Sequence, residues 1–212
     1  LAVDPVSPFT GGALLGDRIR LTDHFNDPEV FIRSLSTRGK LGGLSLATRE
    51  AVYLCDAFGF DYVLIETVGV GQSEVEVRKL ADCTLVVLVP EWGDGVQAIK
   101  AGILEIGDVF CVHKSDREGA ERVATELRQT LQGLPRVPPV LLSQQKDEAS
   151  LRAVLQAMGD FVLHEKNLVQ ARRQTAQEAT LSELVENFWV ERTREWVKSQ
   201  TTQVKNPYQG YL

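Results

Sequence analysis

The chain has 212 residues and a formal net charge of −6, from 23 Lys and Arg against 29 Asp and Glu. This acidic balance argues against a nucleic-acid partner, because non-specific binding to a phosphate backbone requires a basic surface. Apolar residues make up 43% of the chain, an ordinary globular proportion, and no apolar run approaches the roughly 20 residues that cross a bilayer, so we expect no membrane partner.

Short apolar runs alternate with helical patterns over the first two-thirds of the chain. The runs lack polar alternation, which is typical of strands buried on both faces of a parallel sheet. The alternation with helices indicates βαβ units, and we predict an α/β fold, a doubly wound and mostly parallel sheet, over residues 1–147. The expected strands are 62–66, 84–89, 109–113 and 140–142, and the expected helices are 47–58, 96–106 and 118–131.

The last third of the chain has a different character. From Glu148 onward apolar residues recur at helical spacing, and Trp189 and Trp196 lie seven residues apart. No strand pattern appears before the break at Asn206 and Pro207. We predict a helical extension over residues 148–212, whose apolar seam would pack either on its own domain or against a second copy of the chain.

The three cysteines, Cys55, Cys83 and Cys111, are far apart in the sequence, and no CxxC pair is present. This spacing supports neither a zinc site nor a disulfide framework. We interpret them as small buried hydrophobic residues of a protein in a reducing compartment.

The strongest candidate site follows the apolar run 62–66. Glu66 ends this run and Gly69 follows, so a carboxylate and free backbone N–H groups would meet at the carboxyl edge of a parallel sheet, where ligands bind. Such a carboxylate suits Mg²⁺, and a glycine amide suits a terminal phosphate. Asp4 also ends an apolar run and would lie at the same edge. The alternative is a strand-end glutamate that merely faces solvent.

A second candidate site follows the apolar run 109–112. There the Asp116 carboxylate would accept hydrogen bonds from the N1–H and exocyclic amine of guanine, while the Lys114 stem would lie along the purine. KxD by itself is a common pattern, so this prediction depends on its position at a later strand end. We interpret His113 as a strand-end histidine with satisfied hydrogen bonds, rather than as a catalytic residue or metal ligand.

The order of these segments resembles the MeaB/ArgK-type GTPases, a family of P-loop G proteins that act as metallochaperones. The string ETVGVGQSE at 66–74 is the most specific part of the resemblance. The resemblance is strong over residues 1 to about 130 and looser along the tail. It implies a partial P-loop G domain over residues 1–147 and a helical dimerisation region over 148–212, and so a homodimer. The matching stretches are 1–8, 11–17, 37–43, 65–74 and 92–94.

The resemblance implies a phosphate and metal site. Asp4, Asp17 and Glu66 match the carboxylates that hold Mg²⁺ in the family, and Gly69 matches the glycine that senses the γ-phosphate of GTP. It also implies a base site in which Lys114 and Asp116 read guanine. A later base-contacting loop matches Ser143, Gln144 and Gln145.

The resemblance further implies a protein partner. Asp94 and Lys100 fall in a stretch that matches a mobile third switch, through which these G proteins signal. The partner implied is an adenosylcobalamin-dependent acyl-CoA mutase, typically methylmalonyl-CoA mutase, whose cofactor loading the G protein gates and which it protects.

Three departures from the family pattern bear on these expectations. The chain contains no G-x-x-x-x-G-K-[ST], and the family's P-loop lies upstream of the Asp4 strand, so we expect the sequence to begin after it and the chain alone to be nearly inactive. His113 stands where the family has Asn or Thr, and Ser143-Gln144-Gln145 replaces a Ser-Ala type of loop.

Our leading interpretation is a GTP-binding, GTP-hydrolysing chaperone of a cobalamin-dependent mutase, with slow intrinsic turnover because no residue is an obvious general base. One alternative is a truncated, non-catalytic interaction or dimerisation module. Another is an ATPase or kinase linked to basic amino-acid transport. The expected location is the cytoplasm, or the mitochondrial matrix if the protein is eukaryotic.

Overall fold

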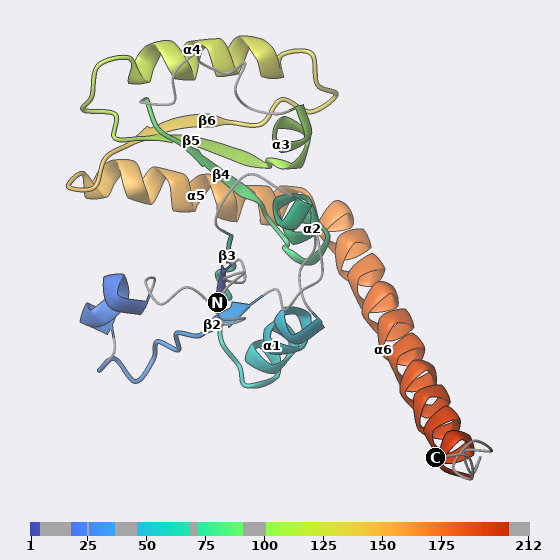
Figure 1. The fold of residues 1–212 in the computed structure, drawn as a ribbon. Coiled ribbons are helices and arrows are strands. Elements are labelled where there is room, and N and C mark those ends of the chain that lie inside the picture. The colour runs from blue at the N-terminus through green and yellow to red at the C-terminus, as the bar shows by residue number, and fades with distance from the viewer. Residues whose placement is uncertain (5–17, 25, 37–45, 68–71, 91–100, 204–212) are drawn as a thin grey trace, which may run out of the picture.

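The computed structural model describes residues 1–4, 18–24, 26–36, 46–67, 72–90 and 101–203. Within these residues the strands pair in parallel, and helices both separate the strands and form the C-terminal part (Figure 1). The predicted α/β fold with a helical C-terminal extension is therefore confirmed. In chain order the elements are β1 (Ala2–Asp4), the 3-10 helix η1 (Arg18–His24), β2 (Ser34–Ser36), α1 (Leu46–Ala57), β3 (Glu66–Thr67), α2 (Gln72–Leu80), β4 (Leu85–Leu88), α3 (Ala101–Ile106), β5 (Val109–His113), α4 (Ala120–Leu131), β6 (Val140–Ser143), α5 (Glu148–His164) and α6 (Lys166–Gln203).

The described strands form two three-stranded sheets, with the orders β2-β1-β3 and β4-β5-β6. In the second sheet β5 is the central strand, and it is the strand whose apolar run is buried throughout. Helix α4 covers one face of this sheet and α5 covers the other (Figure 1). This arrangement explains why the sequence of β5 shows no polar alternation, because neither of its faces meets solvent.

The core of the second sheet lies beneath α4. The spacing of Val123, Leu127 and Leu131 predicts one apolar face for this helix, and all three side chains are buried. Leu127 and Leu131 pack with Phe110 of β5, and each of the three has an exposed fraction of 0%. Burial of each such side chain contributes about 1.5–3 kcal/mol relative to exposure, so this contact anchors α4 on the sheet.

The apolar run 62–66 differs from its predicted structure. Only Glu66 and Thr67 form a strand, while Tyr62 and Leu64 are 86% and 70% exposed. The reason is that β1 supplies pairing partners to Glu66 and Thr67 alone, and a strand forms only where a neighbour supplies hydrogen bonds. An apolar run predicts that its residues prefer burial, but it does not identify the strand or helix against which they would pack.

The other elements follow the predicted ranges closely. Strands β4, β5 and β6 lie within one or two residues of the expected 84–89, 109–113 and 140–142. Helix α3 occupies the second half of the expected helix 96–106, whose first residues lie outside the described part of the chain. Of the cysteines, Cys55 and Cys111 are buried as predicted, whereas Cys83 is only half-buried.

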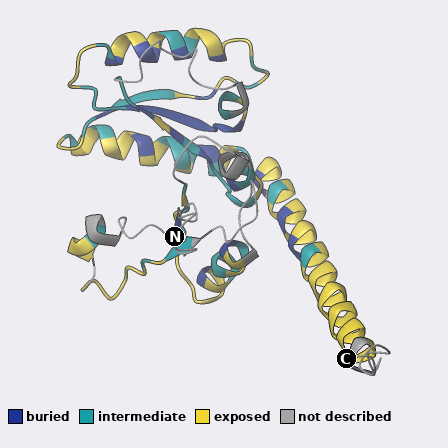
Figure 2. Cartoon of the chain, in the orientation of Figure 1, coloured by how far each residue is buried: buried dark blue, intermediate teal, exposed yellow. Residues whose placement is uncertain are grey.

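The C-terminal extension begins with α5, which starts at the predicted Glu148. Asp147 caps this helix, and its Oδ1 accepts hydrogen bonds from the backbone N–H groups of Ala149 and Ser150. Since α5 packs on β5 and β6, it adheres to the second sheet, while the division of the chain into domains at 147/148 stays a prediction. Helix α6 packs its first half against α1 and α2 and exposes its second half (Figure 2).

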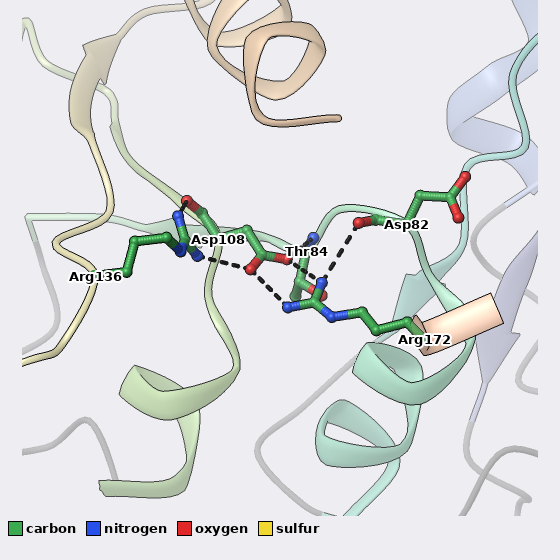
Figure 3. Close-up of polar contacts among 5 residues, drawn as sticks. All are labelled: Asp82, Thr84, Asp108, Arg136 and Arg172. Carbon is green, nitrogen blue, oxygen red and sulfur yellow. Dashed lines mark hydrogen bonds and ion pairs between the residues drawn. The ribbon is translucent and has the colours of Figure 1, made fainter. Parts of the chain in front are cut away.

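A buried carboxylate fixes α6 to the second sheet. Asp108, with an exposed fraction of 0%, accepts hydrogen bonds from the Thr84 backbone N–H at 3.0 Å, from Arg136 at 2.8 Å and from Arg172 of α6 at 2.7 and 2.9 Å (Figure 3). Both guanidinium groups also lie over the Phe161 ring of α5, at 4.7 and 5.6 Å from its centroid. The hydrogen bonds to Asp108 raise the pKa of Arg172, so this guanidinium keeps its charge.

Candidate functional site

The carboxyl ends of β5 and β6 bring two candidate loops together. His113 ends β5 and Ser143 ends β6, and the two residues are register partners in the parallel sheet. The loop 114–116 follows the first strand and 144–147 follows the second. The sheet therefore places Lys114 and Asp116 at the same edge as the loop of Ser143, Gln144 and Gln145. In the sequence these two segments are far apart, and nothing in it shows that they meet.

The first loop begins with an unusual backbone conformation at Lys114. Its φ of 57° is the only positive φ of a non-glycine residue in the described part of the chain. The left-handed region costs a residue with a side chain about 1–2 kcal/mol, and such conformations persist where the surrounding structure enforces them. Here the Arg117 N–H donates to the Lys114 carbonyl at 3.0 Å and closes the turn. The Asp116 carboxylate is exposed beside this turn.

Ser143 joins the two loops. Its side chain is buried, with an exposed fraction of 1%, and its Oγ lies 2.8 Å from His113 Nδ1 and 3.0 Å from Cys111 Sγ. Its carbonyl accepts a hydrogen bond from the Ser115 N–H at 3.0 Å. Burial raises the pKa of the Cys111 thiol, so this group keeps its proton. His113 thus has a satisfied Nδ1, as predicted, and its partner lies in the second loop.

The second loop is braced by Asp147 and Ser150, which the sequence interpretation missed. The Asp147 N–H donates to the Gln144 carbonyl at 3.2 Å, and Ser150 Oγ accepts from the Gln144 N–H at 3.3 Å while donating to the Asp147 carbonyl at 2.8 Å. An Asp immediately before a helical pattern is a cap signal that would have identified this brace. Gln144 is half-buried and Gln145 is exposed, so both remain accessible from the loop.

The predicted metal and phosphate site falls in the first sheet and is only partly described. β1 and β3 are parallel neighbours, but Glu66 pairs with Ala2 at the start of β1, so it lies two residues before the level of Asp4 rather than beside it. Glu66 is exposed, and carboxylate oxygens are the ligands that Mg²⁺ prefers, so this residue fits the role. Asp17, Gly69, Asp94 and Lys100 lie outside the described residues, as does the side chain of Asp4.

The described residues contain neither a metal-binding cluster nor a helix that could span a membrane. No group of three or more His, Cys, Asp or Glu side chains there is arranged to hold a metal ion. None of the helices in the described part, including the 38-residue α6, combines the length and the apolar character needed to cross a bilayer.

Comparison with protein families gives a match over nearly the whole chain. The sequence model described as "Methylmalonyl Co-A mutase-associated GTPase MeaB" matches residues 1–200. Among individual proteins, one from Pyrococcus horikoshii that carries the name of a GTPase is 60% identical over 127 residues, which is 60% of this chain and 40% of that protein.

Two further relatives extend the comparison. GTPase ArgK of Escherichia coli is 44% identical over 124 residues, covering 58% of this chain and 38% of its own length. The Caenorhabditis elegans protein named methylmalonic aciduria type A homolog, mitochondrial, is 37% identical over 184 residues, covering 82% of this chain and 46% of its own length. The chain therefore spans less than half the length of these relatives.

Proposed function

Because this chain belongs to the MeaB family of methylmalonyl-CoA mutase-associated GTPases, we propose that it is the guanine-reading part of a GTP-binding and GTP-hydrolysing protein. The observation that carries the proposal is the junction of the β5 and β6 loops at one sheet edge, where Ser143 connects them. A carboxyl edge of a parallel sheet is where α/β proteins bind nucleotides.

Guanine recognition follows from the chemistry of this junction. The exposed Asp116 carboxylate accepts hydrogen bonds from the base N1–H and exocyclic amine, a pair of donors that adenine does not present at the same positions. The aliphatic stem of Lys114 lies along the purine face. The base oxygen is an acceptor, and the amide groups of Gln144 and Gln145 in the accessible second loop supply donors for it.

The phosphate end of the nucleotide belongs to the first sheet in this proposal. Glu66 would hold Mg²⁺ with Asp4 and Asp17, and the backbone N–H of Gly69 would meet the γ-phosphate. When bound, Mg²⁺ neutralises charge that develops on the β- and γ-phosphates. Helix α2 begins at Gln72, three residues after Gly69, and packs against α3 and α6. A change at Gly69 on hydrolysis would therefore reach both helices through α2.

The partner proposed is an adenosylcobalamin-dependent acyl-CoA mutase of the methylmalonyl-CoA mutase type. The description of the family and the name of the C. elegans relative support this choice. Asp94 and Lys100 would contact the mutase from the segment between β4 and α3, the latter of which packs on α2. We place the protein in the cytoplasm, or in the mitochondrial matrix of a eukaryote.

The exposed half of α6 supports a homodimer. Its large apolar side chains Phe188, Trp189 and Trp196 are 57%, 64% and 64% exposed. A monomer would leave this aromatic surface in water, and aromatic residues are enriched in the cores of protein interfaces. A second copy of α6 would cover them.

Hydrolysis measured with and without the mutase tests this function. The full-length protein should hydrolyse GTP slowly alone and faster with the mutase, and should alter adenosylcobalamin loading of the mutase. The Asp116→Ala variant is the control, because it should lose the nucleotide while leaving the second sheet folded. Unchanged hydrolysis together with unchanged cofactor loading would contradict the proposal.

A further inference from the structure

We propose that His113 is a positioning residue that locks the two base-reading loops together through Ser143, and so sets the preference for guanine. The inference rests on the proposed function, since a base preference exists only if the site binds guanine nucleotides. It assigns a role to the position at which the sequence departs from its family's Asn or Thr.

The contacts that carry the inference converge on one buried atom. Ser143 Oγ lies 2.8 Å from His113 Nδ1 and 3.0 Å from Cys111 Sγ, in a side chain that is 1% exposed. In addition to these side-chain contacts, the Ser115 N–H donates a backbone hydrogen bond to the Ser143 carbonyl. The loop that carries Asp116 is therefore attached to the second loop by both its backbone and its side chains.

In the proposed lock the hydrogen bonds run from Cys111 through Ser143 to His113. Burial raises the pKa of the Cys111 thiol, so this group keeps its proton and can donate to Ser143 Oγ. The Ser143 hydroxyl then donates to His113 Nδ1. His113 consequently adopts the tautomer with its proton on Nε2, and its Nδ1 acts as an acceptor fixed by the second loop.

The lock lies beside the strained backbone. Lys114, with its φ of 57°, directly follows His113 and leads into the turn that presents Asp116. A left-handed residue relaxes unless its neighbours enforce it. Anchoring of the preceding side chain to a buried hydroxyl provides that enforcement, and loss of the anchor would let the Asp116 carboxylate move relative to the base.

Two substitutions at His113, to Asn and to Leu, have similar shapes. They distinguish the effect of its hydrogen bond to Ser143 from the effect of its packing. Asn places polar atoms two bonds beyond Cβ, as far along the side chain as the Nδ1 of His, so Asn can accept from Ser143. Leu places methyl groups at those positions and cannot accept. His113→Asn should therefore preserve the lock, and His113→Leu should remove it and leave the buried Ser143 hydroxyl without its acceptor.

The test measures dissociation constants for GDP and for IDP, whose base lacks the exocyclic amine that Asp116 would read, with the full-length protein and its variants. His113→Leu and Ser143→Ala should each reduce the preference for GDP over IDP about tenfold, the loss expected for one buried hydrogen bond. His113→Asn should restore the preference to within about twofold of wild type. His164→Leu, at the exposed end of α5, is the matched control and should leave the preference unchanged.

The outcomes distinguish the lock from the function on which it rests. Suppose that wild type prefers GDP over IDP. If His113→Leu keeps that preference, or weakens the binding of GDP and IDP equally, the lock is wrong and the proposed function stands. If wild type binds GDP no better than ADP, the proposed function fails and the lock with it. Should His113→Leu not fold, nitrogen NMR of wild-type His113 decides, because a proton on Nδ1 contradicts the assigned hydrogen-bond direction.

Discussion

At the scale of single residues, Asp116 carries the base specificity in this account. Asp116→Asn replaces a carboxylate that accepts two hydrogen bonds with an amide that donates one. The variant should bind GDP at least about tenfold more weakly and should gain affinity for the xanthine nucleotide XDP, whose base offers a carbonyl in place of the amine. Titration of the full-length protein with GDP and XDP measures both effects. Equal loss for both nucleotides would mean that Asp116 does not read the base.

Asp108 gives a prediction about stability rather than about binding. Asp108→Asn keeps the acceptor for the Thr84 N–H but removes the charge that two arginines face, of which Arg172 is only 10% exposed. The free energy of unfolding should fall by about 3–5 kcal/mol, since the variant leaves a buried charge uncompensated. Urea denaturation of the variant and of wild type measures the change.

The matched control for Asp108 is an ion pair on the surface. Glu148 and Arg152 are 76% and 75% exposed, so Glu148→Gln should change the free energy of unfolding by at most about 1 kcal/mol. If the two variants lost the same stability, the buried cluster would have no special role in attaching α6.

The raised pKa of Cys83 should make the free energy of unfolding depend on pH in the alkaline range. Burial, with a contribution from Asp108, raises its pKa from 9.0 to about 12. The folded chain therefore holds this proton more tightly than the unfolded chain, so the stabilisation is complete below pH 9 and is lost as the pH rises toward 12. Between pH 8 and pH 10.5 the free energy of unfolding, measured by urea denaturation, should fall more for wild type than for Cys83→Ala. Parallel pH profiles would contradict the assignment.

The residues of the candidate site differ in how far the sequence could predict them. Lys114 and Asp116 are two residues apart in a local pattern at a strand end, and such a pattern is visible in one sequence. The contact of His113 with Ser143 joins residues 30 positions apart, and the cluster at Asp108 joins residues 28 and 64 positions apart. These contacts depend on strand register and helix docking, which no local spacing encodes.

At the scale of elements, the turn into β5 depends on a glycine. A Cβ at Gly107 would overlap the ring of Phe110, which is fully buried beneath α4. Gly107→Ala should therefore destabilise the chain by about 1–3 kcal/mol, because the ring would have to shift against Leu127 and Leu131, which pack with it. Gly133 is the matched control, since nothing lies within 4 Å of a Cβ placed there. Thermal unfolding of both variants tests this, and equal midpoints would contradict it.

Helices and strands could be predicted from the sequence where the apolar pattern within the segment itself decides its structure. Strand β5 and helices α4 and α5 carry strong patterns, and each forms within two residues of its predicted start. The run 62–66 carries an equally strong pattern but forms only the short β3, because its pairing depends on β1. Apolar content predicts which residues prefer burial, while the extent of a strand depends on its neighbours.

At the scale of the whole molecule, α6 is the proposed dimer interface. Trp196→Glu places a charge in the exposed aromatic surface and should raise the dimer dissociation constant about thirtyfold, the effect of an interface residue worth 2 kcal/mol. Arg194→Glu is the control, because residue 194 lies on the far side of the helix from Phe188, Trp189 and Trp196. Sedimentation of the full-length protein measures both variants. A wild-type monomer, or equal effects of the two substitutions, would contradict this interface.

The proposed role of the junction of the β5 and β6 loops is to read guanine. Calorimetric titration of the full-length protein with GDP and with ADP, both in the presence of Mg²⁺, tests it most directly. GDP should bind at least about tenfold more tightly than ADP, through donors that only guanine offers to Asp116. Equal affinities for the two nucleotides, or no binding of GDP, would contradict it.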